Sequence, residues 1–465
     1  MTRQPSAPSA PHGGTVSMIS LGCPRTLVDS ELYLGRLARA GFQIVDSVES
    51  SDIALINTCS FIQEAIQESI ETILQAVELK KQGKVKAVIV AGCLVQRFKQ
   101  GLIKELPEVD GFVGVDGFGD IETVVQRALS GERIQRLRQR PRTLPRDGEA
   151  WREPLTPPHY AYLKISEGCL KGCSFCVIPK IKGPLQSRPI EALVAEATRL
   201  AEERGARELI VVGQDTSDYG VDLYGQPRIA QLLRRLAQVP GLRWIRLLYC
   251  HPRGVSRELI EAIRDEPKIC RYLDMAIEHA DDEVLRRMNR GITQAQLRET
   301  VQRLRGEVSD MALRTSVIVG FPGETEAAFD HLLAFLEEVR FERLGAFQYS
   351  HEEGSAAFRL PDPVPDAIRQ QRFDRVMQWQ QRIARELNQR AVGRTFEVLI
   401  DERDPGDPLV ALGRTSADCP EVDGTVFVHS AQPLAPGSIV PVRITDSFEY
   451  DLVGTVAVPV PAAGD

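Results

Sequence analysis

The run Ile165-Ser-Glu-Gly-Cys-Leu-Lys-Gly-Cys-Ser-Phe-Cys-Val177 brings three cysteines, Cys169, Cys173 and Cys176, into one short loop. Three thiolates from one loop can hold three irons of a cubane 4Fe–4S cluster and leave the fourth iron open to a small molecule. Structural zinc sites usually take four protein ligands, and no fourth cysteine or histidine follows nearby. The spacing therefore predicts a reactive cluster, with a chance grouping of buried thiols as the weaker alternative.

A second set of three cysteines shares a sequence context rather than a local motif. Each follows an apolar run that reads as a strand: Cys23 after residues 16–21, Cys59 after residues 53–57, and Cys93 after residues 85–91. The carboxyl ends of parallel strands line one crevice, where ligands bind. We therefore expect these three thiols to hold a second 4Fe–4S cluster with one open iron. Three unrelated core thiols are the alternative, which we retain for the remaining cysteines, Cys250, Cys270 and Cys419.

The composition indicates a folded, multi-domain chain. Its 465 residues suggest two to four domains, and a hydrophobic share of 43% supports full cores. Nine cysteines, an odd number, fit a reducing cytoplasm better than a disulfide framework. We expect no signal peptide and no membrane span, because no apolar run is long enough.

The amino-terminal third alternates strand-like and helical patterns, which predicts an open parallel α/β domain over residues 15–130. Residues 1–14, rich in Pro, Ser and Ala, read as a disordered tail. The stretch 131–154 is rich in arginine and proline and is expected to be a solvated linker, with a binding patch as the alternative.

The central region, residues 155–392, repeats the alternation six times and predicts a partial (β/α)6 barrel. The expected strands are Tyr160–Ile165, Glu208–Val212, Trp244–Tyr249, Tyr272–Ile277, Arg314–Val319 and Arg343–Gln348. The loop with Cys169 follows the first of these strands, so the chemistry is expected at the carboxyl ends. A long helix over 366–390 should connect this barrel to the last domain.

The last region, residues 393–460, consists of short β-branched runs broken by Gly and Pro, which predicts a small antiparallel β-barrel of the oligonucleotide-binding type. Between residues 393 and 459 it has eleven acidic and four basic residues. Nucleic-acid binding depends on cationic contacts with phosphate, so this excess of seven negative charges favours a basic protein partner, with a merely acidic surface as the alternative. The acids are Glu397, Asp401, Glu402, Asp404, Asp407, Asp418, Glu421, Asp423, Asp446, Glu449 and Asp451.

With these motifs in place, the chain resembles the radical S-adenosylmethionine (SAM) methylthiotransferases over residues 16 to 458. That family joins a cluster domain, a radical SAM domain and a terminal TRAM barrel. The runs that carry the resemblance to its ribosomal-protein branch are Ser20-Leu-Gly-Cys-Pro-Arg-Thr-Leu-Val-Asp-Ser-Glu31, Asn57-Thr-Cys-Ser-Phe-Ile62, Ala91-Gly-Cys-Leu94, Ile178-Pro-Lys-Ile-Lys-Gly183, Gly213-Gln-Asp-Thr-Ser-Asp-Tyr-Gly220 and Gly320-Phe-Pro-Gly-Glu324.

Two details qualify the match. The family's tRNA enzymes usually carry Gln-Met-Asn near the first cysteine, and this chain does not. The segment Asp274-Met-Ala-Ile-Glu-His279 has Ala276 and Glu278 where the family normally has Pro and Gln.

The resemblance implies that the enzyme inserts a methylthio group at the β-carbon of an aspartate in small-subunit ribosomal protein twelve. It implies two SAM molecules and two 4Fe–4S clusters, with the cluster on Cys169, Cys173 and Cys176 binding SAM and the other carrying sulfur. It implies no catalytic acid or base, because the cofactor carries the radical step. An electron donor such as flavodoxin or ferredoxin is also implied, and we expect a cytoplasmic monomer; the sulfur donor leaves no pattern in the sequence.

Candidate SAM contacts are the glycine-containing strand ends, where the backbone can approach a ligand closely. They comprise Gly213, Gln214 and Asp215 after one strand and Gly320 and Pro322 after another; ordinary turns are the alternative. Phe175, inside the cysteine loop, should shield the cluster or pack against adenine, with core packing as the alternative.

Two other functions remain open from the sequence. One is a tRNA methylthiotransferase that modifies an adenosine derivative by the same chemistry. The other is a non-catalytic iron–sulfur scaffold or electron carrier, which two incompletely ligated clusters disfavour.

Overall fold

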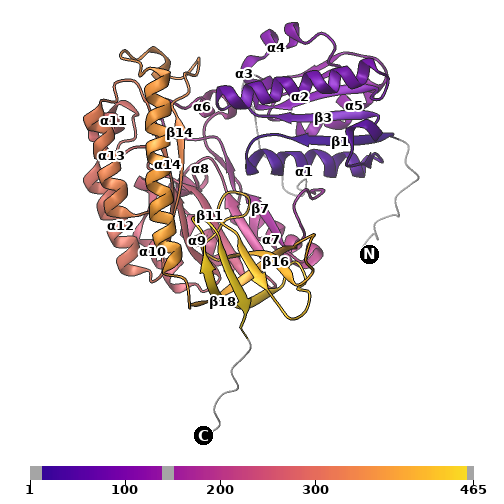
Figure 1. Cartoon of the computed structure of the whole chain (residues 1–465). Coiled ribbons are helices and arrows are strands. Elements are labelled where there is room, and N and C mark those ends of the chain that lie inside the picture. Colours follow the sequence, from indigo (N-terminus) through magenta and orange to yellow (C-terminus); the bar gives the residue numbers. More distant parts are fainter. Residues whose placement is uncertain (1–12, 139–150, 458–465) are drawn as a thin grey trace.

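The computed structural model describes residues 13–138 and 151–457, whose main strands form two parallel sheets and one small barrel (Figure 1). The predicted tail at residues 1–14 lies almost wholly outside these residues. So do residues 139–150 of the predicted linker and the last three residues of the predicted terminal domain.

The first sheet has six parallel strands in the order β2-β1-β3-β4-β5-β6. Its central strands β3 and β4 are buried along their whole length because helices cover both faces, as parallel sheets require. The strands are β1 (Thr15–Ser20), β2 (Gln43–Ile44), β3 (Ile53–Thr58), β4 (Ala87–Gly92), β5 (Gly111–Val113) and β6 (Ile134–Arg136). The helices are α1 (Pro24–Arg39), α2 (Gln63–Lys81), α3 (Cys93–Phe98), α4 (Gln100–Glu105) and α5 (Ile121–Leu129).

Strand β6 corrects the sequence analysis, which placed residues 134–136 in a solvated linker. Ile134 is buried, and β6 pairs in parallel with β5 at the edge of the sheet. Arg133, read as a linker cation, donates to the carbonyls of Val109, Ile103 and Leu106. One buried isoleucine among charged neighbours is enough for a short edge strand, and such a pattern is too brief to recognise in the sequence.

The central sheet has six parallel strands in chain order, β7-β10-β11-β12-β13-β14, and its two edge strands do not pair with each other. This is the predicted partial barrel. Its strands are β7 (Tyr160–Lys164), β10 (Glu208–Val212), β11 (Trp244–Cys250), β12 (Ile269–Met275), β13 (Ala312–Val319) and β14 (Arg343–Gln348), with the separate pair β8 (Ser166–Glu167) and β9 (Gln186–Ser187) beside the cysteine loop.

Helices cover the outer face of this sheet, with capping residues at several starts. Thr293 and Gln296 form a capping box at the start of α12, and Gly205 ends α7 in the left-handed conformation. The helices are α6 (Ile178–Lys182), α7 (Ile190–Arg204), α8 (Val221–Tyr224), α9 (Ile229–Ala237), α10 (Arg257–Asp265), α11 (Asp282–Arg287), α12 (Gln294–Glu307) and α13 (Glu326–Val339). No helix in the described part of the chain is long and apolar enough to cross a membrane.

Helix α14 (Asp366–Gln389) is the predicted long helix, and it runs beside the central sheet to the terminal barrel (Figure 1). That barrel closes from five strands in the order β15-β16-β17-β19-β18. They are β15 (Thr395–Arg403), β16 (Val410–Thr415), β17 (Val426–His429), β18 (Ile439–Ser447) and β19 (Leu452–Val456). The barrel is antiparallel except that β17 and β19 are parallel. Directions cannot alternate around a ring with an odd number of strands, so the predicted small barrel closes through this one parallel pair.

The terminal barrel closes the amino-terminal mouth of the central sheet with the loop of residues 416–423, which we call the plug loop. The Ser416 carbonyl accepts a hydrogen bond from Arg246, and Asp418 forms an ion pair with Arg343. The Asp423 carboxylate accepts a hydrogen bond from the Tyr272 hydroxyl. Several of the barrel's acids therefore bind the central sheet instead of facing solvent.

At the centre of this contact, Glu208 is completely buried between two arginines. Its carboxylate lies 2.7 Å from Arg246 Nε and 2.7 Å from Arg414 Nη1, and Arg414 also pairs with Asp401. Burial alone would raise the pKa of Glu208, but the two guanidinium groups hold this pKa below its ordinary value. The carboxylate thus stays ionised between two domains.

The first domain is joined to the central sheet by a second buried ion cluster, which we call the junction cluster: Asp29, Lys164, Glu167 and Lys182. Asp29, on α1, pairs with both lysines, and Lys182 Nζ lies 3.2 Å from Glu167 Oε2. All four side chains are buried. Removing one partner of a buried ion pair is strongly destabilising, because the other charge is left unpaired. The cluster therefore fixes α1 against β7 and β8.

We predict that Glu208→Ala lowers the free energy of unfolding by about 3 kcal/mol, because Arg246 would lose its only carboxylate partner in a buried site. Urea denaturation followed by tryptophan fluorescence measures the change. Glu261→Ala, which removes an exposed pair with Arg257, serves as the control and should leave the midpoint unchanged. Equal midpoints for both variants would contradict the assignment.

We predict that Asp29→Ala loosens the junction between the first domain and the central sheet, because Lys164 and Lys182 would share the single carboxylate of Glu167. Amide hydrogen exchange should rise in α1 and in residues 160–167. Glu122→Ala, which removes the surface pair with Arg36 in the same domain, should leave exchange at the junction unchanged. Protection of α1 that survives in Asp29→Ala would refute this role.

Candidate active site

Cys169, Cys173 and Cys176 project from the loop that follows β7 and β8. Gly168 begins this loop at a φ of +78°, and a β-carbon there would lie 2.1 Å from the Pro184 carbonyl oxygen, so only glycine fits. On the other side, Ser174 is hydrogen-bonded to the carbonyls of Met288 and Arg287. The loop is thus fixed before any ligand binds.

The three thiols of this loop share one environment. All three are partly exposed, whereas Cys250, Cys270 and Cys419 are buried, as expected for core residues. Burial raises the pKa of Cys169 to about 11 and that of Cys176 to about 12, with the neighbouring thiols adding to both shifts. Arg290 Nη1 donates to Cys173 Sγ at 3.1 Å.

A cavity of about 650 Å³ opens beside this loop. The cysteine loop and the start of α6 form one side of its wall, and the segment before α14 forms the other. The lining residues are Gly172, Cys173, Cys176, Pro179, Lys180, Glu353, Gly354, Ser355, Ala356, Phe358 and Arg359. Two of the three thiols are therefore open to a ligand.

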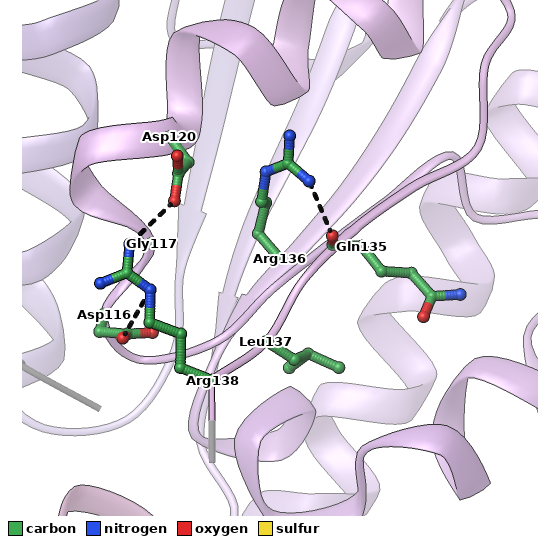
Figure 2. A pocket seen from close by; sticks show the side chains of 7 residues that line it. All are labelled: Asp116, Gly117, Asp120, Gln135, Arg136, Leu137 and Arg138. Carbon is green, nitrogen blue, oxygen red and sulfur yellow. Dashed lines mark hydrogen bonds and ion pairs between the residues drawn. The ribbon is translucent and has the colours of Figure 1, made fainter. Parts of the chain in front are cut away.

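A second pocket, of about 350 Å³, lies in the first domain and contains none of the predicted site residues (Figure 2). Its Arg138 points toward Asp116 and Asp120, at 3.5 and 3.6 Å. Arg138 is thus paired with the two acids of this pocket, and Arg136 donates to the Gln135 carbonyl. We assign it no part in the site.

Cys23, Cys59 and Cys93 follow the adjacent strands β1, β3 and β4. In the sheet register Thr58 lies opposite Gly92, so the next residues, Cys59 and Cys93, leave neighbouring strands together. Gly22 has a φ of +98°, and a β-carbon there would lie 3.1 Å from Cys59 Sγ. The three strand ends thus place the three thiols at the same edge of the first sheet, and their role as cluster ligands stays a prediction.

The electrostatics of this second triad are uneven. Burial raises the pKa of Cys93 to about 12. Burial also acts on Cys23, but the adjacent guanidinium of Arg25, whose Nε donates to Cys23 Sγ at 3.3 Å, lowers the pKa of Cys23 to about 7. Cys23 is therefore the thiol best prepared to serve as a thiolate, while Cys93 needs the positive charge of a metal.

Gly213, Gln214 and Asp215 also lie in this region. The Gly213 carbonyl accepts a hydrogen bond from Arg25, which joins β10 to the Cys23 triad. Gln214 donates to Glu167, while its own buried carbonyl oxygen has no partner among the described residues. Asp215 accepts from Ser217 and pairs with Lys171 of the cysteine loop. The Gln214 oxygen and Asp215 Oδ2, which has only the ion pair with Lys171, therefore lack a hydrogen-bond partner among the described residues.

The other predicted contacts have ordinary structural surroundings. Gly320 has a φ of +74° and packs against the side chain of Arg369, and its amide donates to Glu324 in a tight turn. The Pro322 carbonyl accepts from Arg287. Phe175 packs in an apolar cluster with Met288 and other residues. Their roles as cofactor contacts stay predictions.

Several residues of the site were missed by the sequence reasoning. Arg290 comes from beyond α11, about 115 positions from the thiol it contacts, and has no local signal. Arg25 stands two residues after Cys23, where the motif could have drawn attention to it. Glu278 was noted only as a departure from the family; it has a φ of +69°, and its carboxylate affects the pKa of Cys176. The structure thus places Glu278 near the first triad.

The donor sets fit iron–sulfur clusters. In the part of the chain that the structure describes, no three His, Cys, Asp or Glu side chains lie close enough together to hold a single metal ion. A cubane cluster instead takes each thiolate on a separate iron and needs the sulfurs farther apart. Each triad offers three partly exposed thiols, the ligand type that such clusters use, and their roles as cluster ligands stay predictions.

Three family models match separate parts of the chain: "Uncharacterized protein family UPF0004" over residues 15–114, "Radical SAM superfamily" over residues 163–336, and "TRAM domain" over residues 392–457. Among solved structures, the radical SAM methyltransferase TsrM from Kitasatospora setae with a SAM analogue bound is similar at a TM-score of 0.51. It is 14% identical, over 71% of this chain and 72% of that one, and this likeness concerns the fold alone.

Curated relatives are similar along nearly their whole length. The protein "Ribosomal protein uS12 methylthiotransferase RimO" of Geobacter sulfurreducens is 45% identical over 95% of this chain and 98% of its own. Proteins of the same name from Anaeromyxobacter sp. (strain K) and Clostridioides difficile are 46% and 42% identical, covering 96% and 95% of this chain and 96% and 98% of their own. The chain therefore belongs to the RimO family of radical SAM methylthiotransferases.

Proposed function

We propose that this protein inserts a methylthio group at the β-carbon of an aspartate in ribosomal protein uS12, using SAM and two 4Fe–4S clusters. The observation that carries the proposal is the pair of cysteine triads at the carboxyl ends of two parallel sheets, linked by Arg25 and the junction cluster. The names of the relatives, at 42–46% identity, supply the substrate.

Each triad has a separate role in this proposal. Cys169, Cys173 and Cys176 hold the cluster that binds SAM, and Cys23, Cys59 and Cys93 hold the cluster that carries sulfur. When bound, these groups supply a radical able to remove hydrogen from an unactivated C–H bond and a sulfur atom to replace it, which no side chain can do. A scaffold or electron carrier would have no use for two triads that each leave an iron open.

The chain's own residues then fix and insulate these groups. Arg290 donates to Cys173, and Lys171 pairs with Asp215 and Asp218, which holds the cysteine loop over the end of β10. Behind the loop, Phe175, Met288 and Phe321 form an apolar layer that keeps water from the cluster.

The terminal barrel supports a protein substrate for a different reason than its charge count suggested. Six of its eleven acids pair with, or accept a hydrogen bond from, the central region, although Glu397 and Glu421 also stay exposed: Glu397, Asp401, Asp418, Glu421, Asp423 and Glu449. Two of its four cations are also engaged, Arg414 with Glu208 and Arg394 with Asp310. Only Arg403 and Arg443 lack an acidic partner among the described residues. A barrel with two free cations offers little for phosphate contacts, which disfavours tRNA.

The remaining parts of the proposal concern partners. A flavodoxin or ferredoxin supplies electrons, and the protein acts as a monomer in the cytoplasm. These rest on the family resemblance and on the reducing compartment indicated by nine free cysteines.

The substrate is tested by mass spectrometry of digested uS12 and of digested tRNA from a strain that lacks the gene. We expect the aspartate-containing peptide of uS12 to lose the mass of the methylthio group, while the methylthiolated nucleosides of tRNA stay unchanged. A change confined to tRNA would overturn the proposal in favour of the tRNA enzyme.

The separate roles of the triads are tested by two cysteine variants. Cys173→Ala should abolish release of 5′-deoxyadenosine from SAM in the anaerobically reconstituted, reduced protein. Cys59→Ala should retain this release and about half of the iron, because each triad holds one cluster, and should fail to transfer sulfur. Cys270→Ala, in the core, is the control. Equal loss of cleavage in Cys173→Ala and Cys59→Ala would argue against two roles.

A further inference from the structure

Arg25 contacts both the Cys23 triad of the first domain and the carboxyl end of β10 in the central sheet. Its Nε donates to Cys23 Sγ at 3.3 Å, and its Nη1 donates to the Gly213 carbonyl at 2.9 Å, at the end of β10. Asp215, two residues further along, pairs with Lys171 of the other cysteine loop. A group held by Arg25 therefore lies beside the first domain's triad and at the mouth of the central sheet.

Within residues 13–138 and 151–457, the guanidinium of Arg25 has no carboxylate partner, whereas most of the buried lysines and arginines have one. Seven lysine and arginine side chains are buried in the described part of the chain, and six of them lie within 4.0 Å of a carboxylate: Lys164, Lys182, Arg188, Arg246, Arg372 and Arg414. The seventh is Arg290. The half-buried Arg25 likewise has no carboxylate within 4.0 Å among the described residues. Arg25 and Arg290, which both lack a carboxylate within 4.0 Å among the described residues, are the two arginines that donate to a triad sulfur.

Arg25 and Arg290 differ in what they leave free. Arg290 uses Nη1 on Cys173 and Nη2 on the Ala276 carbonyl, and its Nε is buried. Arg25 Nη2 forms no hydrogen bond with a described residue, and it is not among the fully buried atoms that lack a partner, so it is the part of this guanidinium that is left for a ligand. Only Arg25 therefore presents an open N–H edge to the site.

Tyr249 holds this edge in place. The Arg25 guanidinium lies over the Tyr249 ring, 4.6 Å from its centre. Tyr249 has a φ of +59° inside strand β11, which is unfavourable for a side chain of this size, and Asp274 accepts a hydrogen bond from its amide. Backbone strain of this kind persists where the surroundings demand it, commonly at functional sites. Here it keeps the Tyr249 ring beneath the guanidinium of Arg25.

We propose that Arg25 binds the carboxylate of the aspartate that is modified and so selects aspartate over asparagine; this rests on the proposed function. A guanidinium recognises a planar carboxylate through parallel N–H donors and stays charged at any physiological pH. In aspartate the β-carbon is bonded directly to the carboxylate carbon. Binding the carboxylate at Arg25 therefore places that β-carbon between the two triads, where hydrogen is removed and sulfur is added.

The rival role for Arg25 is only to offset the negative charge of Cys23. Arg290 performs that role at Cys173 without an open edge, so it provides a matched control. An arginine that only offsets charge should not affect the choice between aspartate and asparagine in a bound peptide.

The test compares two synthetic peptides of the uS12 substrate loop, one with the target Asp and one with Asn in its place. Fluorescence anisotropy on the anaerobically loaded protein gives both dissociation constants. We expect the wild type to prefer the Asp peptide by at least about tenfold. Arg25→Gln should abolish this preference, Arg25→Lys should keep part of it, and Arg290→Gln should keep it in full. Iron content confirms that each variant is loaded, so the comparison does not depend on catalysis.

A second measurement needs no variant. The arginine reagent phenylglyoxal should modify Arg25 in the free protein, and peptide mapping should show protection by the Asp peptide but not by the Asn peptide. An undiminished Asp preference in Arg25→Gln, an equal loss in Arg290→Gln, or equal protection by both peptides would overturn the inference. Methylthio transfer to the Asp peptide, followed by mass spectrometry, tests the proposed function separately. The wild type can transfer the group even if Arg25 does not bind the carboxylate, so the two failures are distinguishable.

Discussion

The junction cluster of Asp29, Lys164, Glu167 and Lys182 is the interaction on which the site depends. It buries two carboxylates and two ammonium groups between α1 and the start of the central sheet. Charged groups in such a place are costly unless every one is paired, so the two domains fit in one relative position. The carboxyl ends of both sheets, and with them the two cysteine triads, are thereby fixed facing the same region.

The terminal barrel is also fixed by buried ion pairs, at the opposite mouth of the central sheet. Glu208, Arg246 and Arg414 form a buried chain of charges, and Asp418 and Asp423 of the plug loop extend it to Arg343 and Arg314. The acidity of the barrel is in large part a docking surface for the arginines of the central strands. The outward face has a smaller charge than the sequence suggests, and the preference for protein over nucleic acid depends on the scarcity of free cations rather than on an excess of acids.

The two cysteine triads are chemically alike, but the arginines beside them differ in their surroundings. Each has one sulfur that accepts an arginine N–H, and hydrogen bonds and nearby charge are the means by which a protein adjusts an iron–sulfur cluster. Arg290 is enclosed, whereas Arg25 is open at one edge and stacked on a strained tyrosine. The first domain thus contributes a cationic anchor as well as sulfur ligands. This anchor matches a substrate that reacts at the carbon next to a carboxylate.

The sequence by itself determined the three-part architecture, the six cysteines and the family, because cysteine spacing and strand–helix alternation are local patterns that survive without knowledge of packing. It could also place the second triad, because strand ends in a parallel sheet meet by topology. It misread residues 134–136 and the acids of the barrel, since an edge strand and an ion pair across a domain contact depend on partners far away in the chain. Only the tertiary structure decided that Arg25 reaches both Cys23 and Gly213, that Arg290 reaches Cys173, and that Tyr249 adopts a strained conformation beneath Arg25. These contacts arise where separate domains meet, and side-chain geometry at such a meeting is set by the packing of both surfaces together.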